Sequence, residues 1–388
     1  MATLTEPAVR SAPVTVRPVA SRRDLSRFLR LPWTIYANDP HWVPPLLVDV
    51  REFVNRRKHP FYRHGDAVLF LAERGGRAIG RIMASDDLRY NEIRGTNVGC
   101  FGMFESIDEP FVAHALLDAA ADWLRRRGRS QVLGPIEYSA NYTCGLLVDG
   151  FNTPPRVLMN HHPPYYAELL ESWGLEGVQD MYSWWFVDPL DMVARWRERA
   201  ERIVARSGIT VRPFSKRDFQ TDVARCQEIA NLALKDNWGS VPLTSAEAEY
   251  FARQLARIAD PNLVLLAEAG GKPIGFSITI PDVNEAIRPL NGRLTRFGLP
   301  FPLLRLVRRM RNVRTARFLA VGVLEEHRCR GVLELLVLRT LDYGKNVLKY
   351  TGAELGWTLV DNERINRAIE RVGGRRYKTY RVYQKNLV

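Results

Sequence analysis

Hydrophobic and polar residues alternate along two neighbouring runs, Ala67–Glu73 and Arg77–Ala84, which are separated by Gly75-Gly76. Alternation of this kind is typical of half-buried β-strands, and paired glycines between such runs indicate a tight turn. The runs Leu263–Glu268 and Lys272–Ile280 have the same arrangement around a second pair of glycines. The pattern therefore predicts one β-hairpin in each half of the chain.

These hairpins belong to a longer internal repeat. Phe70–Gly80 reads FLAERGGRAIG and Leu265–Gly275 reads LLAEAGGKPIG, an offset of 195 positions. The same offset relates Thr15–Pro18 to Thr210–Pro213, and both segments read TVRP. Solenoid repeats are only about 20–50 residues long, so this spacing indicates two copies of one globular domain.

The remaining elements follow one order in both halves. Apolar residues at helical spacing share one face of a predicted helix over Phe111–Arg127, namely Leu116, Leu117, Ala120 and Leu124. The other predicted strands are Val14–Pro18, Val98–Phe104, Gln131–Tyr138, Met181–Val187, Thr210–Pro213, Ala316–Val323, Glu354–Leu359 and Arg376–Gln384. The other predicted helices are Arg22–Arg30, Tyr165–Trp173, Pro189–Arg206, Asp222–Ala233, Gly331–Leu348 and Asn366–Val372. Strands followed by helices in a mainly antiparallel run predict a mixed α/β fold.

The length of 388 residues is sufficient for two domains that each bury a core. We expect a flexible tail over residues 1–12, a first copy over 13–188, a helical linker over 189–207 and a second copy over 208–388. The second copy carries an insertion over residues 282–315, where a compact domain needs only a short turn.

Composition narrows the class of protein. The formal net charge is +13, which favours acidic partners such as nucleic acid, CoA-type phosphates or anionic lipid headgroups. The four cysteines are far apart and form no CxxC pair, so neither a disulfide framework nor a zinc site is expected, and a reducing cytoplasm suits them. No apolar run reaches the about 18 residues of a membrane span. Because no nucleic-acid-binding motif is present, we do not expect nucleic acid as a partner.

One segment of the second copy has the features of an anion-binding turn. The strand Phe318–Val323 runs into Leu324–Leu333 (LEEHRCRGVL) and then into a helix. Backbone N–H groups at a helix start have no partner within the helix and, together with the helix dipole, attract a phosphate. Gly331 would let a phosphate approach the backbone closely, and Arg328 and Arg330 add positive charge. A charged loop before a helix is the alternative interpretation.

With this turn included, the order of elements resembles the GNAT superfamily of GCN5-related N-acyltransferases. The resemblance implies two GNAT-like domains in tandem and a loop, Q/R-x-x-G-x-G/A, that binds the pyrophosphate of acyl-CoA. Arg328, Gly331 and Leu333 occupy the signature positions, although Leu333 departs from the usual Gly or Ala. The residues implied at the acyl-CoA site are Val321, Val323, Arg328, Cys329, Arg330, Gly331, Val332, Leu333, Asn362 and Asn366. Acyl-CoA would be a co-substrate, with no tightly bound cofactor and no metal ion.

The first copy lacks this loop. Glu105, Asp108 and Glu109 follow its strand and would repel a pyrophosphate, so we expect this copy to shape the acceptor pocket. The residues expected to contact the acceptor are Tyr138, Asn141, Tyr165, Tyr166 and Trp357. The polar and aromatic segment Tyr138–Phe151 has the composition of a binding loop, and a purely structural turn is the alternative.

A closer resemblance covers nearly the whole chain. The segments Gly145–Phe151, Met159–Asn160, Pro164–Tyr166 and Glu354–Asn362 look like those of the bacterial ceramide synthase-like (YghO-like) group of double-GNAT proteins. The resemblance implies N-acylation of a long-chain, sphingoid-type amine, with the acyl group carried by CoA or by an acyl carrier protein. Two alternatives stay open: an acetyltransferase for a small soluble amine, and a non-catalytic protein that binds acyl-CoA or a membrane.

The insertion gives an independent indication of lipid. Ala286–Arg317 contains nine arginines and no Asp or Glu. Pro302 is suited to open a helix, and the apolar residues beyond it recur at three- and four-residue steps: Leu303, Leu306, Val307, Met310 and Val313. A basic amphipathic helix predicts peripheral binding to an anionic membrane, here the inner face of the cytoplasmic membrane. Packing on the domain core and a separate phosphate partner are the alternatives.

Candidates for proton transfer come from both copies. The resemblance implies direct attack of the amine on the thioester, so the amine must lose a proton and the leaving thiolate must gain one. GNAT enzymes often supply the second proton from a Tyr in a short helix, where this chain has Ile369. Tyr377 is a substitute for that residue, unless it merely packs in the core. Glu354, His161 and His162 are the candidate bases.

Overall fold

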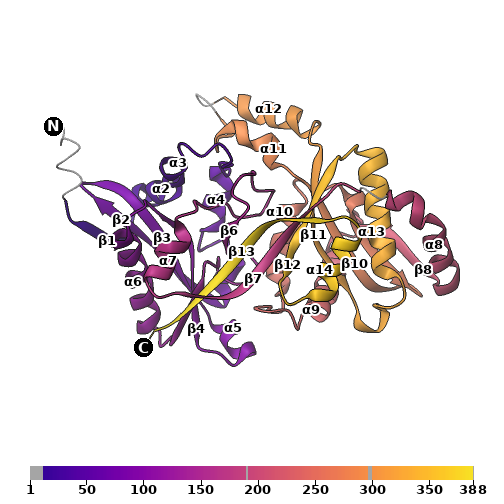
Figure 1. The fold of residues 1–388 in the computed structure, drawn as a ribbon, viewed down its shortest axis with the longest axis horizontal. Coiled ribbons are helices and arrows are strands. Elements are labelled where there is room, and N and C mark those ends of the chain that lie inside the picture. Colours follow the sequence, from indigo (N-terminus) through magenta and orange to yellow (C-terminus); the bar gives the residue numbers. More distant parts are fainter. Residues whose placement is uncertain (1–11, 189–190, 296–298, 388) are drawn as a thin grey trace. The chain divides into compact units, whose positions relative to one another are not determined.

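The computed structural model describes residues 12–188, 191–295 and 299–387 (Figure 1). These residues form two compact units. The first comprises the chain up to Asp180, Asn291–Arg293 and the residues from Tyr380 onward; the second comprises Met181–Leu290 and Leu294–Thr379. The strands β7 (Glu176–Phe186) and β13 (Arg375–Asn386) therefore contribute residues to both units. The predicted tail lies almost wholly outside the described residues, and the repeat boundaries at 188 and 208 stay a prediction.

The first unit is built on a mixed sheet. Its strands lie in the order β1 (Val14–Pro18), β2 (Gly65–Arg74), β3 (Arg77–Asp87), β4 (Val98–Ser106), β5 (Gln131–Gly134) and the last part of β13, and β6 (Leu146–Asp149) also pairs with β13. Only β4 and β5 pair in parallel within the described β1–β5 run. The helix α6 (Pro110–Arg126) packs on β3 and buries the four apolar residues that the sequence pattern assigns to one face.

Shorter helices complete the first unit: α2 (Arg22–Arg30), α3 (Pro32–Ile35), α4 (Leu47–Phe53), α5 (Leu88–Arg94) and α7 (Tyr166–Ser172). The helix α2 begins at a capping box, in which Ser21 and Asp24 each accept a hydrogen bond from the other's backbone N–H. The sequence analysis missed α3, α4 and α5, because none is long enough to show a periodic apolar face.

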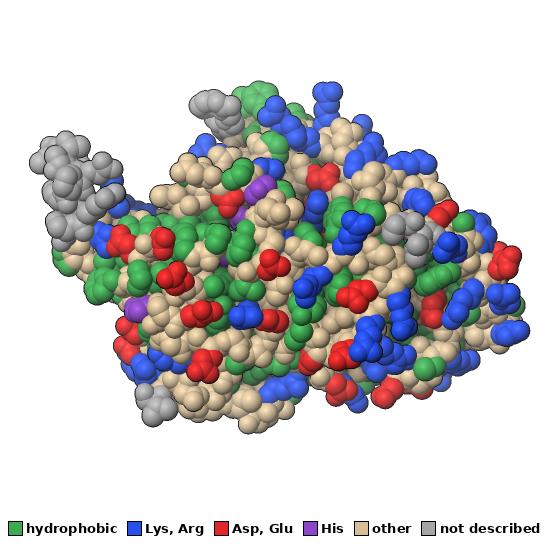
Figure 2. Space-filling model, in the orientation of Figure 1, with side chains coloured by type: hydrophobic (Ala, Val, Ile, Leu, Met, Phe, Trp, Pro, Cys, Tyr) green, Lys and Arg blue, Asp and Glu red, His purple; other side chains and the backbone are tan. Residues whose placement is uncertain are grey.

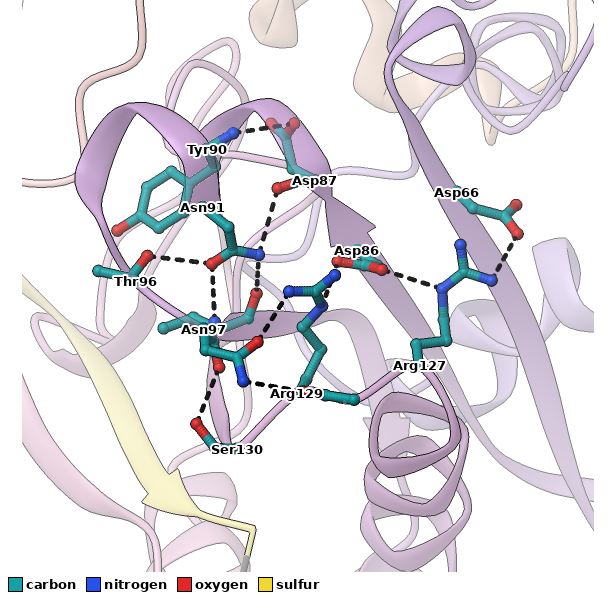
Figure 3. Close-up of polar contacts among 12 residues, drawn as sticks. Asp66, Asp86, Asp87, Tyr90, Asn91, Thr96, Asn97, Arg127, Arg129 and Ser130 are labelled. Carbon is teal, nitrogen blue, oxygen red and sulfur yellow. Dashed lines mark hydrogen bonds and ion pairs between the residues drawn. The ribbon is translucent and has the colours of Figure 1, made fainter.

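Buried ion pairs hold one end of the first sheet (Figure 3). The Asp86 side chain is almost fully buried and lies 3.0 Å from Arg127 Nε and 2.8 Å from Arg129 Nε. Next to it, the Asp87 carboxylate accepts hydrogen bonds from the backbone N–H groups of Arg89 and Tyr90, which caps α5. This cluster joins the end of β3 to the loop that follows α6.

The second unit has a corresponding mixed sheet. Its strands lie in the order β7 (from Met181), β12 (Gly352–Leu359), β11 (Thr315–Val323), β10 (Lys272–Pro281), β9 (Val264–Ala269) and β8 (Ile209–Pro213). Its helices are α8 (Met192–Ser207), α9 (Phe219–Ala233), α10 (Ser245–Leu255), α11 (Asn284–Ile287), α12 (Phe301–Met310), α13 (Val332–Asp342) and α14 (Glu363–Arg371). Gly275 lies against Val332 of α13, whereas Gly322, paired with the next residue Phe276, lies against Ala233 of α9. The helices α13 and α9 therefore cover opposite faces.

The structure confirms the internal repeat in detail. The pairing of Thr15 with Glu73 in the first unit recurs as Thr210 with Glu268 in the second. Each copy also has one four-residue ion-pair cluster at this place, namely Arg17, Arg27, Asp24 and Glu73 in the first and Arg212, Arg225, Asp222 and Glu268 in the second. The TVRP segments thus have a physical reason to be alike, since each supplies an arginine that pairs with both carboxylates of its cluster.

Several predicted element bounds are corrected by the structure. The strand expected to run to Tyr138 ends at Gly134, because Pro135 has no N–H to continue the ladder. The strand expected from Met181 begins at Glu176 instead, and the helix expected to reach Leu348 changes to a π-helix at Tyr343. The helix α10 was missed, although Thr244 and Glu247 form a capping box that the sequence displays.

Candidate functional site

Two neighbouring strands of the second sheet part from each other. The strands β11 and β12 pair in parallel only from Thr315 to Phe318 and from Gly352 to Leu355. Beyond this point, the side chains of Phe318–Val321 and of Leu355–Thr358 are only half-buried, although both strands lie inside the sheet. We call this opening the β11–β12 wedge.

The same place in the first unit is closed. The strands β4 and β5 pair over Val98–Cys100, and the backbone N–H of Ile136 then donates to the Phe101 carbonyl at 2.6 Å. A Cβ added to Gly102 would lie 2.5 Å from the Ile136 carbonyl oxygen, and every residue of β4 except Cys100 is buried. The two copies therefore differ at the position where their central parallel strands part.

The wedge leads to the start of α13. Gly331 is the N-cap with a φ of +80°, and no side chain caps the helix. Cys329 and Arg330 are exposed in the preceding loop, and Arg330 Nη1 lies 3.2 Å from His327 Nδ1. The loop also carries the exposed carboxylates of Glu325 and Glu326, so attraction of an anion would rest on the helix start and the two arginines.

The structure gives Gly331 and Arg328 additional roles in the fold. A Cβ on Gly331 would lie 2.6 Å from the Ile203 side chain, so glycine is required where α8 packs on α13, as well as by its positive φ. Close approach of a phosphate is therefore not needed to explain this glycine. The Arg328 guanidinium donates to the carbonyls of Val323 and Ala233, which fixes the loop against α9.

A buried polar cluster lies where the wedge closes. Glu354 is fully buried and pairs in register with Arg317, whose Nε lies 4.0 Å from the Glu354 carboxylate. Ser183 Oγ donates to Glu354 at 3.2 Å, and the Tyr377 hydroxyl donates to its other oxygen. We call these four residues the Glu354 cluster. The structure thus brings together two candidates, Glu354 and Tyr377, that come from different strands.

Burial raises the pKa of Glu354, and Arg317 and the hydrogen bonds from Tyr377 and Ser183 oppose that rise. A carboxylate with a raised pKa is a stronger base than an ordinary one. Glu354 itself does not reach solvent, whereas Tyr377 is half-buried and packs edge-on against Trp185. Tyr377 is therefore the accessible end of the cluster.

Asn362 and Asn366 have structural partners. The Asn362 side chain accepts from the Ile365 N–H and so caps α14. Asn366 donates to the Leu359 and Val360 carbonyls and accepts from Thr358 at 2.6 Å. Trp357 is half-buried in β12 beside the wedge. Of these three residues, only Trp357 borders the wedge.

The two adjacent histidines of the first unit differ. His161 Nε2 lies 2.7 Å from the Asp39 carboxylate, and this contact lowers the pKa of Asp39 although burial opposes it. His162 Nδ1 accepts from the Leu147 N–H, and burial lowers the pKa of His162 to about 3. His162, one of the candidate bases, is thus neutral at physiological pH and only a weak base. His161 with Asp39 is the better-suited pair for proton transfer.

The tyrosines of the first unit are mostly engaged in the fold. Tyr138 is fully buried, and its hydroxyl donates to the Phe53 carbonyl at 3.0 Å. Tyr166 is also fully buried and donates to Glu105 at 2.8 Å, while Tyr165 donates to the Ser106 carbonyl. Asn141 is half-buried, with its backbone N–H donating to Ser139 Oγ. Of the five residues expected to contact the acceptor, Asn141, Tyr165 and Trp357 keep exposed surface in this structure.

Sequence reasoning missed three residues that contact these candidates, namely Asp39, Ser183 and Arg317, and it missed Arg81, which pairs with Glu105. Arg81 is buried and lies 3.3 Å from Glu105, which explains why the first copy tolerates this acidic residue inside β4. Arg317 and Ser183 are isolated polar residues in predicted apolar strands. That pattern was the available signal, since a buried polar group needs a partner.

The described residues hold neither a candidate metal site nor a candidate membrane span. No group of three or more His, Cys, Asp or Glu side chains that could hold a metal ion is found among them. Within the same residues, no helix has both the length and the apolar character needed to cross a membrane.

Comparison with known proteins gives two near-full-length relatives, although no protein-family model matches the chain. The chain is 37% identical over 384 residues to a protein named bacterial ceramide synthase from Caulobacter vibrioides, covering 97% of this chain and 98% of that protein. It is 34% identical over 375 residues to protein YghO from Escherichia coli, covering 96% and 95% respectively.

Solved structures share the fold. A tandem GNAT protein from the clavulanic acid biosynthesis pathway has a TM-score of 0.57 at 14% identity. The match covers 97% of this chain and 99% of that protein's chain. A GCN5-related N-acetyltransferase from Sphaerobacter thermophilus has a TM-score of 0.53 at 16% identity, with 97% of each chain covered. The predicted fold, two GNAT-like domains in tandem, is confirmed.

Proposed function

The chain belongs to the family of the bacterial ceramide synthase and YghO proteins, and on this premise we propose that it joins a long-chain acyl group from acyl-CoA to a sphingoid-type amine. It is an N-acyltransferase with the tandem GNAT fold. The observation that carries the proposal is the β11–β12 wedge, which opens in the second unit and is closed at the corresponding place in the first.

The proposed donor site extends from the wedge to α13. The uncapped N–H groups around Val332 and Leu333 would bind the donor's pyrophosphate, with Arg330 and the backbone of Cys329 beside it. The backbone of Val321 and Val323, past the point where β12 parts from β11, would hold the thioester end. An acyl carrier protein presents the same phosphopantetheine thioester without the nucleotide, so it is the alternative donor.

The proposed chemistry is direct transfer. The amine nitrogen attacks the thioester carbonyl carbon, the carbon–sulfur bond breaks, and an amide and a thiol result. Tyr377 would accept the amine's proton while its own proton passes to Glu354, and the reverse movement would protonate the leaving sulfur. The raised pKa of Glu354 supports this role, because a stronger base draws the proton more readily.

The first unit has polar groups of its own that suit an amine. Its half-buried Asn141 and Tyr165 offer polar contacts, and its His161–Asp39 pair offers a proton acceptor. A long-chain amine resides in a membrane, so we propose a cytoplasmic enzyme that works at the inner face of the cytoplasmic membrane. No nucleic acid is needed for this function.

The function is tested with purified full-length protein in detergent. We expect palmitoyl-CoA and a sphingoid base to give the N-acyl product, detected by mass spectrometry, because a long wedge-bound chain contributes apolar contacts that an acetyl group lacks. The matched controls are acetyl-CoA with the same base, palmitoyl-CoA with a small polyamine, and acetyl-CoA with that polyamine. Equal or faster transfer from acetyl-CoA to the small amine would refute the proposal and favour a small-amine acetyltransferase.

A further inference from the structure

The helix α12 exposes apolar side chains that the rest of its unit does not cover. None of its residues is buried, and Phe301, Leu304 and Val307 are 60%, 63% and 55% exposed. These three residues follow one another at three-residue steps, so they form a stripe along one side of the helix. The stripe differs from the predicted one, because Leu306 and Met310 are half-buried and Val313 is buried. The side of α12 that carries Leu306 and Met310 is thus partly covered, whereas the side that carries Phe301, Leu304 and Val307 is not.

Positive charge lies beside this stripe. Arg305, Arg308 and Arg309 line a cavity of about 690 Å³ together with Leu304, Asn312 and Glu285. In the part of the chain that the structure describes, no ion-pair or hydrogen-bond partner is found for these three arginines. Glu285 is already engaged, since its carboxylate accepts from the Arg314 N–H and from the Thr315 hydroxyl. Figure 2 shows hydrophobic and basic side chains side by side over α12.

We propose that this α12 surface, made of the apolar stripe and the three cavity arginines, docks on a membrane of anionic phospholipids. Headgroup phosphates would enter the cavity, where a guanidinium group can donate bidentate hydrogen bonds to two phosphate oxygens. Phe301, Leu304 and Val307 would lie at the boundary of headgroups and acyl chains, as in other interfacial helices. The inference rests on the proposed function, whose acceptor is a membrane lipid.

Charge and apolarity together select this partner. Nucleic acid would pair with the arginines but would leave the three apolar side chains in water, with no gain from their burial. A second copy of the chain would bring like charges together at the same arginines, on a protein whose net charge is already +13. An anionic bilayer satisfies both parts of the surface at once.

The test measures flotation of the full-length protein with vesicles. We expect strong binding to vesicles that contain phosphatidylglycerol, weak binding to pure phosphatidylcholine, and a fall in binding as salt is raised. The variant Arg305→Gln/Arg308→Gln/Arg309→Gln should bind the anionic vesicles roughly a hundredfold more weakly. The control Arg195→Gln/Arg197→Gln/Arg202→Gln removes the same charge from exposed positions on α8 and should bind as the wild type does.

A second pair of variants tests the stripe. Leu304→Ser/Val307→Ser should weaken binding about tenfold, because two exposed apolar side chains no longer enter the interface. Leu232→Ser/Val347→Ser changes two equally exposed residues elsewhere in the unit and serves as the control. All four substituted positions are exposed, so the fold should tolerate the changes.

Unchanged vesicle binding in the arginine variant, or binding to duplex DNA in preference to anionic vesicles, would overturn the proposal. Flotation needs no turnover, so its outcome is separate from that of the activity assay in detergent. Vesicle binding without acyl transfer would refute the proposed substrates alone. Acyl transfer in detergent without vesicle binding would refute the docking surface alone.

Discussion

Glu354→Gln is expected to lower kcat for acyl transfer by about 10²- to 10⁴-fold, the contribution of a positioned general base. The substitution keeps the size and shape of the side chain but replaces the carboxylate that accepts the Tyr377 proton with an amide that cannot take it up. Tyr377→Phe should give a loss of similar size, because it removes the accessible end of the same relay. Steady-state kinetics with palmitoyl-CoA and a sphingoid base measure both.

The pH profile separates a chemical role from a structural one. Since burial raises the pKa of Glu354, the wild-type kcat should fall as pH decreases through that raised value, where the carboxylate becomes protonated. The Gln variant should lose this acidic limb, because its side chain does not titrate.

Asp222→Asn is the matched control for Glu354→Gln. Asp222 is a buried carboxylate of the same unit. It pairs with Arg212 and Arg225 at the β8 edge of the sheet, away from β11 and β12. Loss of the Asp222 carboxylate should lower the free energy of unfolding but leave kcat and its pH dependence unchanged. Equal losses of kcat in both variants, or an unchanged kcat in Glu354→Gln, would remove Glu354 from the mechanism.

Asp86→Ala is expected to destabilise the first unit by about 3 kcal/mol. The substitution leaves Arg129, and in part Arg127, without the carboxylate that compensates their charge inside the protein. The expected loss of stability is at the low end of the range for breaking a buried ion pair, because Arg127 keeps about a third of its side chain in water and also contacts Asp66. Hydrogen exchange of the buried amides in β3 and α6 reports this unit by itself.

Asp122→Ala is the control for this change. Asp122 pairs with Arg125 on the exposed side of α6, where a surface ion pair contributes only about 0–1 kcal/mol. If Asp86→Ala alters exchange in β3 no more than Asp122→Ala does, the cluster of Figure 3 does not hold the sheet.

Local patterns of the sequence predicted much of the fold. The alternation around Gly75-Gly76 gave the hairpin β2–β3, and the repeat placed a second hairpin with the same glycine turn. The spacing of apolar residues predicted α6, because its buried face repeats regularly over the whole helix. The division of β7 and β13 between the two units was not predictable, because a strand has the same period-two pattern whichever sheet it joins.

The candidate site was predictable only in part. The turn at Gly331 was found from its Arg and Gly, but the reason for the glycine is the packing of Ile203, which no local pattern displays. Glu354 and Tyr377 were separate candidates, since residues of different strands meet only in three dimensions. The stripe on α12 was predicted only in part: Val307 is exposed as expected, but Leu306 and Met310 are half-buried, because spacing alone does not say which face of a helix the domain covers.

The central claim is that the second copy, at the wedge and the start of α13, binds the acyl donor. Hydrogen exchange of the full-length protein with and without palmitoyl-CoA tests it directly. The account predicts slower exchange of the amides in Leu319–Val323 and Arg328–Leu335, and no change in Phe104–Val112 of the first copy. Protection confined to Phe104–Val112, or no protection anywhere at a donor concentration that saturates transfer, would contradict it.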